Sequence, residues 1–396
     1  MTTQPYVTQD PLPSNYQERD AEYVYRFLYA GESCSLVGIG SVGKSNLLHF
    51  LMSDDKAKEK HLREQAPYII MVLLDPHKIV HLQKQALAQA GTAWPGYEIM
   101  ISRLRRALEE LDDKNRLPQQ DGADIIATIS RLYLNLFNEQ LLLAQAGIRH
   151  LEEAVFAVMR MAMPAGSPPN LSWKIAFLFD EFEGFRSLPP EFFESLRGVR
   201  DEFKNRIMFV TASRRPLDEL INEWYENDPR GHEIMDGFLE LFRGFTHFIR
   251  LLDRDSAEAL IQRLQKRYNL ELEPANRRNL LDATGRHAGL LRRSFLPMHR
   301  VAVSSLTLDQ ICDYLLRHRG VLQECQTILD SLPLVERICL WQVANGQFDS
   351  FDQEAWNSLG EKHLVDQSHQ GLPSLALPLL RRYLAGLPHP AHGPAR

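Results

Sequence analysis

Residues 38–45 form a glycine-rich stretch that could bind phosphate. Their sequence, Gly-Ile-Gly-Ser-Val-Gly-Lys-Ser, matches the pattern G-x-x-x-x-G-K-[ST]. Glycines let the backbone turn tightly there, so that successive N–H groups point at phosphate oxygens. The ammonium of Lys44 suits the β- and γ-phosphates of a nucleotide, and the hydroxyl of Ser45 suits Mg²⁺. We therefore predict nucleotide contacts from Gly38, Gly40, Ser41, Val42, Gly43, Lys44, Ser45 and Asn46.

A second candidate site lies in the stretch FLFDEFE, residues 177–183, an apolar run that ends in acidic residues. Ligands of open α/β sheets bind at the carboxyl ends of strands, where Asp180 and Glu181 would lie. Asp180 is expected to hold Mg²⁺ through a water, and Glu181 to polarise the water that attacks the terminal phosphate. The alternative is an acidic surface turn. Glu183 is expected to be structural.

Two arginines could act on the developing charge of a phosphate. The apolar run 206–212 is followed by Ser213 and Arg214, and a cation at this strand end could sense the terminal phosphate. Arg243 precedes the apolar run 246–252 and could be an arginine finger that reaches a neighbouring subunit. The alternatives are a solvated loop for Arg214 and a surface salt bridge for Arg243.

These residues need a sheet to position them. The apolar runs 34–40, 67–75, 174–181, 206–212 and 246–252 predict strands, and the continuous ones are typical of strands buried on both faces. Segments 20–30 and 45–55, and much of 97–163, have the apolar spacing of helices. Strands that alternate with helices favour a parallel sheet with right-handed crossovers. The predicted fold class is therefore α/β, with a parallel-sheet P-loop core.

The remainder of the chain predicts smaller helical domains. Residues 253–305 contain no strand-like run and predict a helical lid, with one helix at 255–268 and a second across 274–296. Residues 306–388 predict three helices, a hairpin within 364–377 and a last helix, which together describe a winged helix. The predicted organisation is an N-terminal arm at 1–18, the P-loop core at 19–252, the lid, the winged helix and a tail at 389–396.

Composition sets the broad class of protein. With 396 residues, 44% hydrophobic and 24% charged, the chain has globular composition and the length of two or three domains. A net charge of −6 gives no general attraction to nucleic acid. The four cysteines are scattered, which argues against a disulfide frame or a zinc site. The N-terminus does not resemble a secretory signal and no apolar stretch reaches membrane-spanning length, so we expect a cytoplasmic protein without a membrane partner.

The order of the motifs resembles a known family. The chain carries Arg19-Asp20-x-Glu22, then the P-loop and then Asp-Glu-Phe-Glu. This order of motifs is similar to that of AAA+-like ATPases of the STAND class, bacterial relatives of archaeal initiator ATPases. The resemblance implies ATP or ADP and Mg²⁺ as ligands, a nucleotide contact from Arg19, and Arg214 as the sensor residue. Residues 283–291 resemble the lid motif Gly-Gly-His-Pro-x-Leu-Leu, which implies a nucleotide contact from His287. Arg286 and Ala288 depart from that motif at its second glycine and its proline.

Two functions remain open for the winged helix. In STAND switches it folds onto the nucleotide domain and locks the ADP state, whereas in initiator-like ATPases it binds DNA. The helix predicted at 352–364 carries Asp352, Glu354 and Glu361 against Lys362 and His363, and its acidic groups would repel a phosphate backbone. Arginines gather at 277–300, either as a solvated lid face or as a face for DNA or a partner. The sequence thus favours an intramolecular or protein-binding role over DNA.

We therefore predict a slow ATPase that works as a molecular switch. It would regulate a separately encoded effector protein, in defence or signalling, or form a homo-oligomer. The alternative is a DNA-binding initiator- or transposition-type AAA+ ATPase that assembles on duplex DNA. A scaffold that only binds ATP agrees less well with Lys44, Ser45, Asp180 and Glu181 all being present, and a metabolic kinase would need a second substrate site.

Overall fold

The computed structural model describes residues 12–79, 93–118, 122–138, 144–164, 166–301, 306–347, 352–366 and 373–390. The chain forms two compact units. The first unit comprises residues 1–20, 37–50 and 248–396, and the second comprises residues 21–36 and 51–247. Within the described ranges, no helix has both the length and the apolar character needed to cross a membrane.

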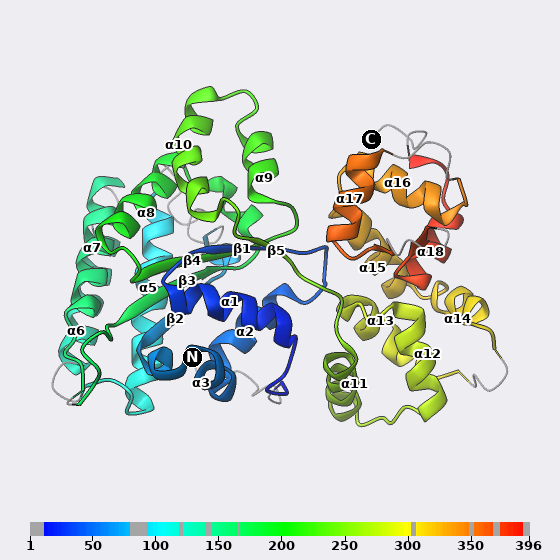
Figure 1. Cartoon of the computed structure of the whole chain (residues 1–396), viewed down its shortest axis with the longest axis horizontal. Helices are drawn as coiled ribbons and strands as arrows, with labels where there is room; N and C mark the ends of the chain where they lie inside the picture. The colour runs from blue at the N-terminus through cyan, green and yellow to red at the C-terminus, as the bar shows by residue number, and fades with distance from the viewer. Residues whose placement is uncertain are drawn as a thin grey trace. The chain divides into compact units, whose positions relative to one another are not determined.

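The second unit is built around a five-stranded sheet (Figure 1). Its strands follow the order β2-β3-β4-β1-β5. Their bounds are β1 (Cys34–Val37), β2 (Ile69–Leu74), β3 (Lys174–Phe179), β4 (Ile207–Ser213) and β5 (Thr246–Phe248). β3 pairs in parallel with β2 and with β4, so that Ile175 lies between Ile70 and Ile207. The predicted α/β class with a parallel sheet is confirmed.

The central strands are apolar throughout because both of their faces are covered. Every residue of β4 is buried, and β2 and β3 each have a single residue that is only partly buried. Continuous apolar sequence is what a strand covered on both faces requires. β5 is shorter than the predicted run 246–252. The N–H of Ile249 still bonds to the carbonyl of Val37, at 2.7 Å, but Leu252 already bonds to the carbonyl of Arg286 in the lid.

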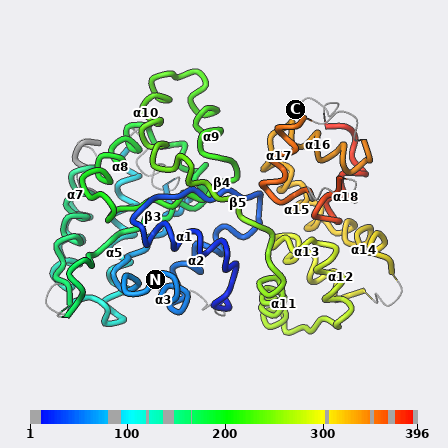
Figure 2. Tube along the Cα trace, viewed as in Figure 1, coloured from blue at the N-terminus to red at the C-terminus, as the bar shows by residue number. Residues whose placement is uncertain are grey.

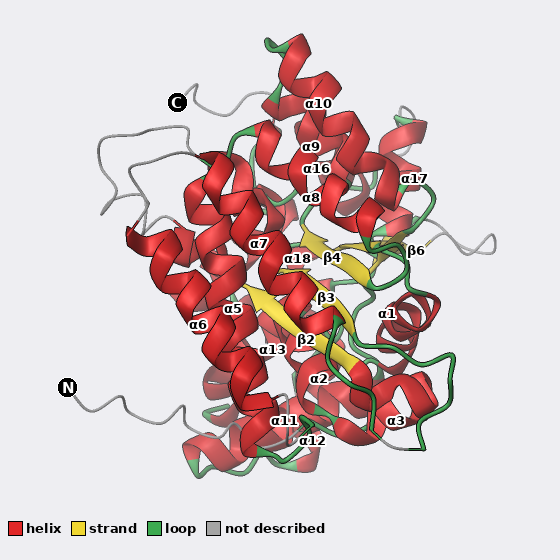
Figure 3. Ribbon diagram, turned by 90° about the vertical axis from the view of Figure 1, so that its left-hand side faces the viewer, coloured by secondary structure: helices red, strands yellow, loops and turns green. Residues whose placement is uncertain are grey.

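Helices flank the sheet of the second unit. Their bounds are α1 (Glu18–Ala30), α3 (Asp55–Leu62), α5 (Trp94–Asp113), α6 (Gly122–Asn138), α7 (Ala144–Met159), α8 (Pro190–Glu202), α9 (Leu217–Trp224) and α10 (Pro229–Leu239), with short 3₁₀ helices at Arg63–Tyr68, Phe182–Ser187 and Glu240–Phe242. α5 packs on β2, and α6 and α7 pack beside it as a layer along the strands (Figure 3). α8 contacts β4 and α10. These helices cover the apolar strands that lead to the candidate site.

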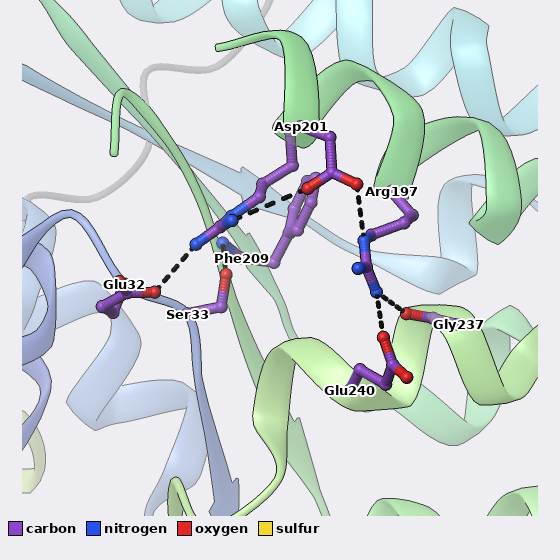
Figure 4. Close-up of polar contacts among 8 residues, drawn as sticks. Glu32, Ser33, Arg197, Asp201, Phe209, Gly237 and Glu240 are labelled. Carbon is purple, nitrogen blue, oxygen red and sulfur yellow. Dashed lines mark hydrogen bonds and ion pairs between the residues drawn. The ribbon is translucent and has the colours of Figure 1, made fainter. Parts of the chain in front are cut away.

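An ion-pair network joins α8 to its neighbours (Figure 4). Arg200 bonds to Glu32, the second residue before β1, at 2.8 Å, and also lies near Asp201. Arg197 bonds to Asp201 at 2.8 Å and to Glu240 at 2.9 Å. The backbone N–H of Phe209 in β4 donates a hydrogen bond to the hydroxyl oxygen of Ser33, at 3.0 Å. The network therefore fixes the starts of β1 and β4 relative to α8.

In the described part of residues 253–305, where the lid was predicted, the first unit contains three helices. They are α11 (Arg254–Tyr268), α12 (Pro274–Thr284) and α13 (Ala288–His299), while α2 (Lys44–Ser53) follows the P-loop. The single helix expected at 274–296 was wrong. Gly285 and Arg286 both have left-handed backbone conformations, with φ of 55° and 62°, and the chain turns there before His287 caps α13. Arg286 thus holds a backbone conformation that non-glycine residues rarely adopt.

The C-terminal part of the first unit contains helices and one small sheet. The helices are α14 (Leu308–Leu315), α15 (Arg319–Asp330), α16 (Leu334–Ala344), α17 (Gln353–Glu361) and α18 (Pro378–Ala385). The strands β6 (Val365–Asp366) and β7 (Ser374–Leu375) pair in antiparallel fashion, as the predicted hairpin requires. Among the residues that the structure describes from 306 onward, four helices precede this pair where three were expected. α18, red in Figure 2, packs against α14 and α16.

Some of the predictions concern segments outside the described residues. They are the first 11 residues of the predicted arm, the hairpin tip at 368–371 and the tail from residue 391.

Candidate nucleotide site

The P-loop of the first unit has the backbone that phosphate binding requires. Ser41 and Gly43 adopt positive φ values of 56° and 123°, which turn the chain into α2. The ammonium of Lys44 folds back and donates to the carbonyls of Gly38, at 2.5 Å, and Ile39, at 3.1 Å. A methyl group on Gly38 would lie 2.8 Å from the side chain of Val42, so this glycine is needed for close packing of the turn. Residues 38–45 can therefore hold a phosphate group with their backbone N–H groups at the N-terminus of α2.

The first turn of α2 carries the two other predicted contacts. Ser45 and Asn46 are both partly exposed there. The side chain of Asn46 hydrogen-bonds to the hydroxyl of Tyr16, a buried residue that precedes α1. Arg19 lies in the first turn of α1 and is exposed. Asn46 is therefore held beside the P-loop by its hydrogen bond to Tyr16. Arg19 is exposed on α1.

The start of α13 lies directly on the P-loop. The imidazole Nε2 of His287 is 2.9 Å from the carbonyl oxygen of Gly40, and the N–H of Gly289 donates to the carbonyl of Ser41 at 3.1 Å. The other ring nitrogen of His287, Nδ1, accepts the N–H of Leu290. Since Nδ1 accepts, Nε2 must carry the proton that it donates to Gly40. The side chain of His287 therefore holds the loop backbone and caps α13 together.

His287 should make the stability of the protein depend on pH. Burial lowers the pKa of this imidazole from 6.5 to about 4, and the charges of Lys44 and Arg292 act in the same direction, against the hydrogen bond to Gly40. The unfolded chain takes up the proton first, so this contribution is complete above about pH 6.5 and is lost as the pH falls through about 4. We expect the free energy of unfolding to fall by up to about 3 kcal/mol across that window from this group.

Urea denaturation at several pH values measures this effect. The His287→Gln variant lacks the titrating ring and should lose much less stability between about pH 6.5 and about pH 4 than the wild type. Equal losses in the two proteins would contradict the role given to His287. His299, at the exposed end of α13, provides a matched His→Gln control.

The C-terminal end of α15 also contacts the P-loop. The hydroxyl of Ser331 accepts the N–H of Gly40, at 3.0 Å, and donates to the carbonyl of Ile328 at 2.6 Å. A methyl group on Gly40 would lie 2.7 Å from the carbonyl oxygen of Thr327. The carboxylate of Glu324 is buried near Gly289 and Ser41, and its Oε1 has no hydrogen-bond partner within the described part of the chain. One N–H group of the loop is thus occupied by the protein itself.

The acidic pair of the second unit lies at the C-terminal end of β3. Asp180 donates its N–H to the carbonyl of Leu74 at the end of β2, and its Oδ1 accepts the N–H of Glu181 at 3.0 Å. Glu181 has a left-handed backbone conformation, with φ of 44°. A non-glycine residue in this conformation is strained, and such strain is common at functional sites. Both side chains are partly exposed.

The end of β4 is tied to the same turn. The carboxylate of Glu183 accepts the N–H of Arg214, which agrees with the structural role expected for Glu183. Arg214 is exposed, and the adjacent Arg215 pairs with Glu223. Arg243 is also exposed and pairs with Asp236 at 2.6 Å, the surface salt bridge that was the alternative to an arginine finger.

The predicted residues therefore fall into two groups. The first unit brings Lys44, Asn46 and His287 to the P-loop, and the second unit brings Asp180 and Glu181 to the turn that also holds Arg214. Sequence reasoning missed Tyr16, Gln17, Glu324 and Ser331 near the loop. Only the position of Tyr16 and Gln17 just before the Arg19 motif could have drawn notice, since the other two are distant in sequence.

No family model and no curated protein matches the sequence. The solved structures similar to it include a Walker-type ATPase of Pyrococcus abyssi, with 13% identity and a TM-score of 0.48 over 96% of this chain and 99% of the other. The ORC1 protein of Aeropyrum pernix, in complex with DNA, has 10% identity and a TM-score of 0.40 over 97% and 96%. Drosophila ORC bound to DNA has 12% identity and a TM-score of 0.35 over 98% and 95%. These likenesses are too distant to place the chain in a family.

Proposed function

We propose that the chain is an ATP-dependent molecular switch of the STAND/AAA+ type. It would bind and hydrolyse Mg²⁺–ATP and regulate a separately encoded effector protein, or its own oligomerisation, through a change in the position of its C-terminal domain. The observation that carries this proposal is the seat of α15 on the P-loop, where Ser331 occupies the N–H of Gly40.

The contact between α15 and the P-loop brings negative charge to a loop that is proposed to bind phosphate. The C-terminal end of a helix carries a partial negative charge from its free carbonyls. α15 presents this end, with the carbonyl of Thr327, to Gly40. Glu324 adds a buried carboxylate beside Ser41; Oε2 of this carboxylate is paired with Arg293 at 3.7 Å, and its Oε1 has no hydrogen-bond partner among the described residues. A phosphate bound by the same loop would be repelled by both groups and would need the N–H that Ser331 accepts. Binding of a nucleotide and closure of α15 therefore oppose one another, which is the coupling that a switch needs.

The site residues are assigned to the reaction as follows. Lys44 and the loop N–H groups hold the phosphates, and Ser45 and Asp180 hold the metal. The magnesium ion would neutralise phosphate charge when bound. Glu181 accepts a proton from the attacking water. Arg214 is proposed as the phosphate sensor, and Arg243 would act as a finger only after leaving Asp236.

A protein-facing C-terminal domain is favoured over a DNA-binding one. If β6 and β7 form the wing of a winged helix, α17 is the helix that would enter the DNA groove. Its N-terminus is acidic, with Asp352 as the cap and Glu354 in the first turn. Lys362, a basic residue just after it, is buried and paired with Glu336. The helix therefore has little positive charge to offer to a phosphate backbone.

Hydrogen exchange of α15 tests the switch. A non-hydrolysable ATP analogue should raise the exchange rate of the backbone N–H groups of residues 319–331, and the increase should be smaller in the absence of Mg²⁺.

The Ser331→Ala variant tests the same contact by affinity. It frees the N–H of Gly40 and removes one hydrogen bond from the closed state, so its affinity for the analogue should rise about 2- to 10-fold. Ser358→Ala removes a hydroxyl that bonds to Glu336 in the same domain and serves as the control.

If the analogue binds and α15 exchanges at the same rate in all states, release of α15 is not part of the switch, although the ATPase assignment survives. The mass of the protein in solution with the analogue, with and without duplex DNA, then separates the two functions. Assembly on the analogue alone supports the protein-facing switch. Assembly that needs DNA, and that weakens steeply with salt, supports the initiator-type alternative.

A further inference from the structure

Gln17 is a buried residue beside the P-loop whose side chain is not used by the fold. It precedes α1, has a left-handed backbone conformation with φ of 43°, and is only 3% exposed. Its main chain is well anchored: the N–H donates to the hydroxyl of Ser256 at 2.9 Å, and the carbonyl accepts the N–H of Asp20 at 3.0 Å. The position of Gln17 is therefore set by its backbone.

The amide of Gln17 has no partner. Neither Nε2 nor Oε1 is accessible, and neither makes a hydrogen bond within the residues that the structure describes. Burying a polar group without a partner is costly, and native proteins rarely accept it without a function. A side chain that stays in place at this cost points to a ligand that completes its hydrogen bonds.

The amide lies against the last glycine of the P-loop. A methyl group on Gly43 would be 3.8 Å from Oε1 of Gln17 and 3.5 Å from the hydroxyl of Tyr16. Tyr16 is itself buried, which raises the pKa of its hydroxyl, and it hydrogen-bonds to Asn46. Three polar side chains from two parts of the chain thus meet beside the N-terminus of α2, where the loop has its phosphate donors.

We propose that Gln17 recognises the base of the bound nucleotide and selects adenine. This inference rests on the proposed nucleotide binding at the P-loop. With the phosphates in the loop, the nucleoside would lie beside the N-terminus of α2, where the amide of Gln17 is located. The amide of glutamine offers a donor and an acceptor side by side, which matches the N6 amino group and N7 of adenine. Guanine presents two acceptors on that edge, O6 and N7, and would leave Oε1 of Gln17 unpaired.

The Gln17→Met variant tests this assignment, because methionine has a similar size and no hydrogen-bonding amide. The probes are ADP and GDP, titrated by calorimetry. We expect the wild type to prefer ADP, and the variant to lose about 10-fold of that preference through weaker binding of ADP, with little change for GDP. Without nucleotide, the variant should unfold at the same temperature as the wild type or higher, since an unpaired buried amide has been removed. Gln262→Met, on the exposed face of α11, is the control.

Other results separate the claims. If the wild type binds neither nucleotide, the proposed function fails before Gln17 is tested. If the wild type binds nucleotide but its ADP-to-GDP preference is unchanged in Gln17→Met and in the second variant, Gln17→Ala, then Gln17 does not read the base. A loss of thermal stability in both nucleotide-free variants, with the ratio unchanged, would show that the amide is structural. Weaker binding of 2′-deoxy-ADP in the wild type alone, with the base ratio unchanged in the variants, would assign the amide to the ribose and overturn the base assignment.

Discussion

Glu181→Gln should lower the rate of ATP hydrolysis by about 10²- to 10³-fold and leave ATP affinity nearly unchanged. This is the range expected when a general base is removed, because the amide cannot accept the proton of the attacking water. The change is nearly isosteric, and the backbone N–H of residue 181 keeps its bond to Asp180. Phosphate release under saturating ATP measures turnover, and calorimetry with a non-hydrolysable analogue measures binding.

Glu183→Gln is the matched control for this prediction. Glu183 stands two residues further along the same turn, and its carboxylate accepts the backbone N–H of Arg214. A glutamine can still accept that bond through its carbonyl oxygen, so turnover should change by only a few-fold. If Glu181→Gln hydrolyses ATP like the wild type while Glu183→Gln does not, the general base is Glu183 and the assignment made from the sequence is wrong.

The strands and the P-loop could be predicted because local sequence determines them. A strand covered on both faces must be apolar throughout, and β2, β3 and β4 are all of this kind. The loop must contain glycine where φ is positive or space is short, as at Gly43 and Gly38. In these segments the local amino-acid sequence therefore predicts the backbone structure directly.

The errors occurred where distant contacts decide the structure. The helix expected at 274–296 ends at Thr284, where Gly285 forms a left-handed C-cap and lies so close to the carbonyl of Ala376 that an added methyl group would be only 2.3 Å away. The extended run 246–252 stops pairing early because Leu252 bonds to Arg286 instead. Neither contact has a signal within its own segment.

The residues around the P-loop were missed for the same reason. Ser331 bonds to Gly40 across 291 positions in the sequence, and a serine at the end of a helix is otherwise an ordinary residue. The amide of Gln17 is unusual only because it is buried without a partner, which is a property of the folded chain. The proposed phosphate chemistry therefore rests on sequence motifs, whereas the control and the selectivity proposed above depend on tertiary structure.

Lys44→Ala should weaken ATP binding by about 10- to 100-fold and reduce hydrolysis to background. A hydrogen bond to a charged phosphate is worth about 1.5–3 kcal/mol, and the ammonium of Lys44 would supply such bonds inside the loop. In the structure this ammonium bonds to the carbonyls of Gly38 and Ile39. Calorimetric titration with ATP measures the loss, and Lys56→Ala, an exposed lysine of α3, is the control.

The same variant separates phosphate binding from the structure of the loop. Lys44 contributes to both, so Lys44→Ala should also lower the free energy of unfolding of the nucleotide-free protein, by about 1 kcal/mol for neutral acceptors. Ser45→Ala keeps the ammonium and removes only the expected metal ligand, and its ATP affinity should fall in the presence of Mg²⁺ but change little when the metal is chelated. If Lys44→Ala binds ATP as tightly as the wild type, residues 38–45 do not hold the nucleotide, and the proposals for Ser331 and Gln17 lose their common basis.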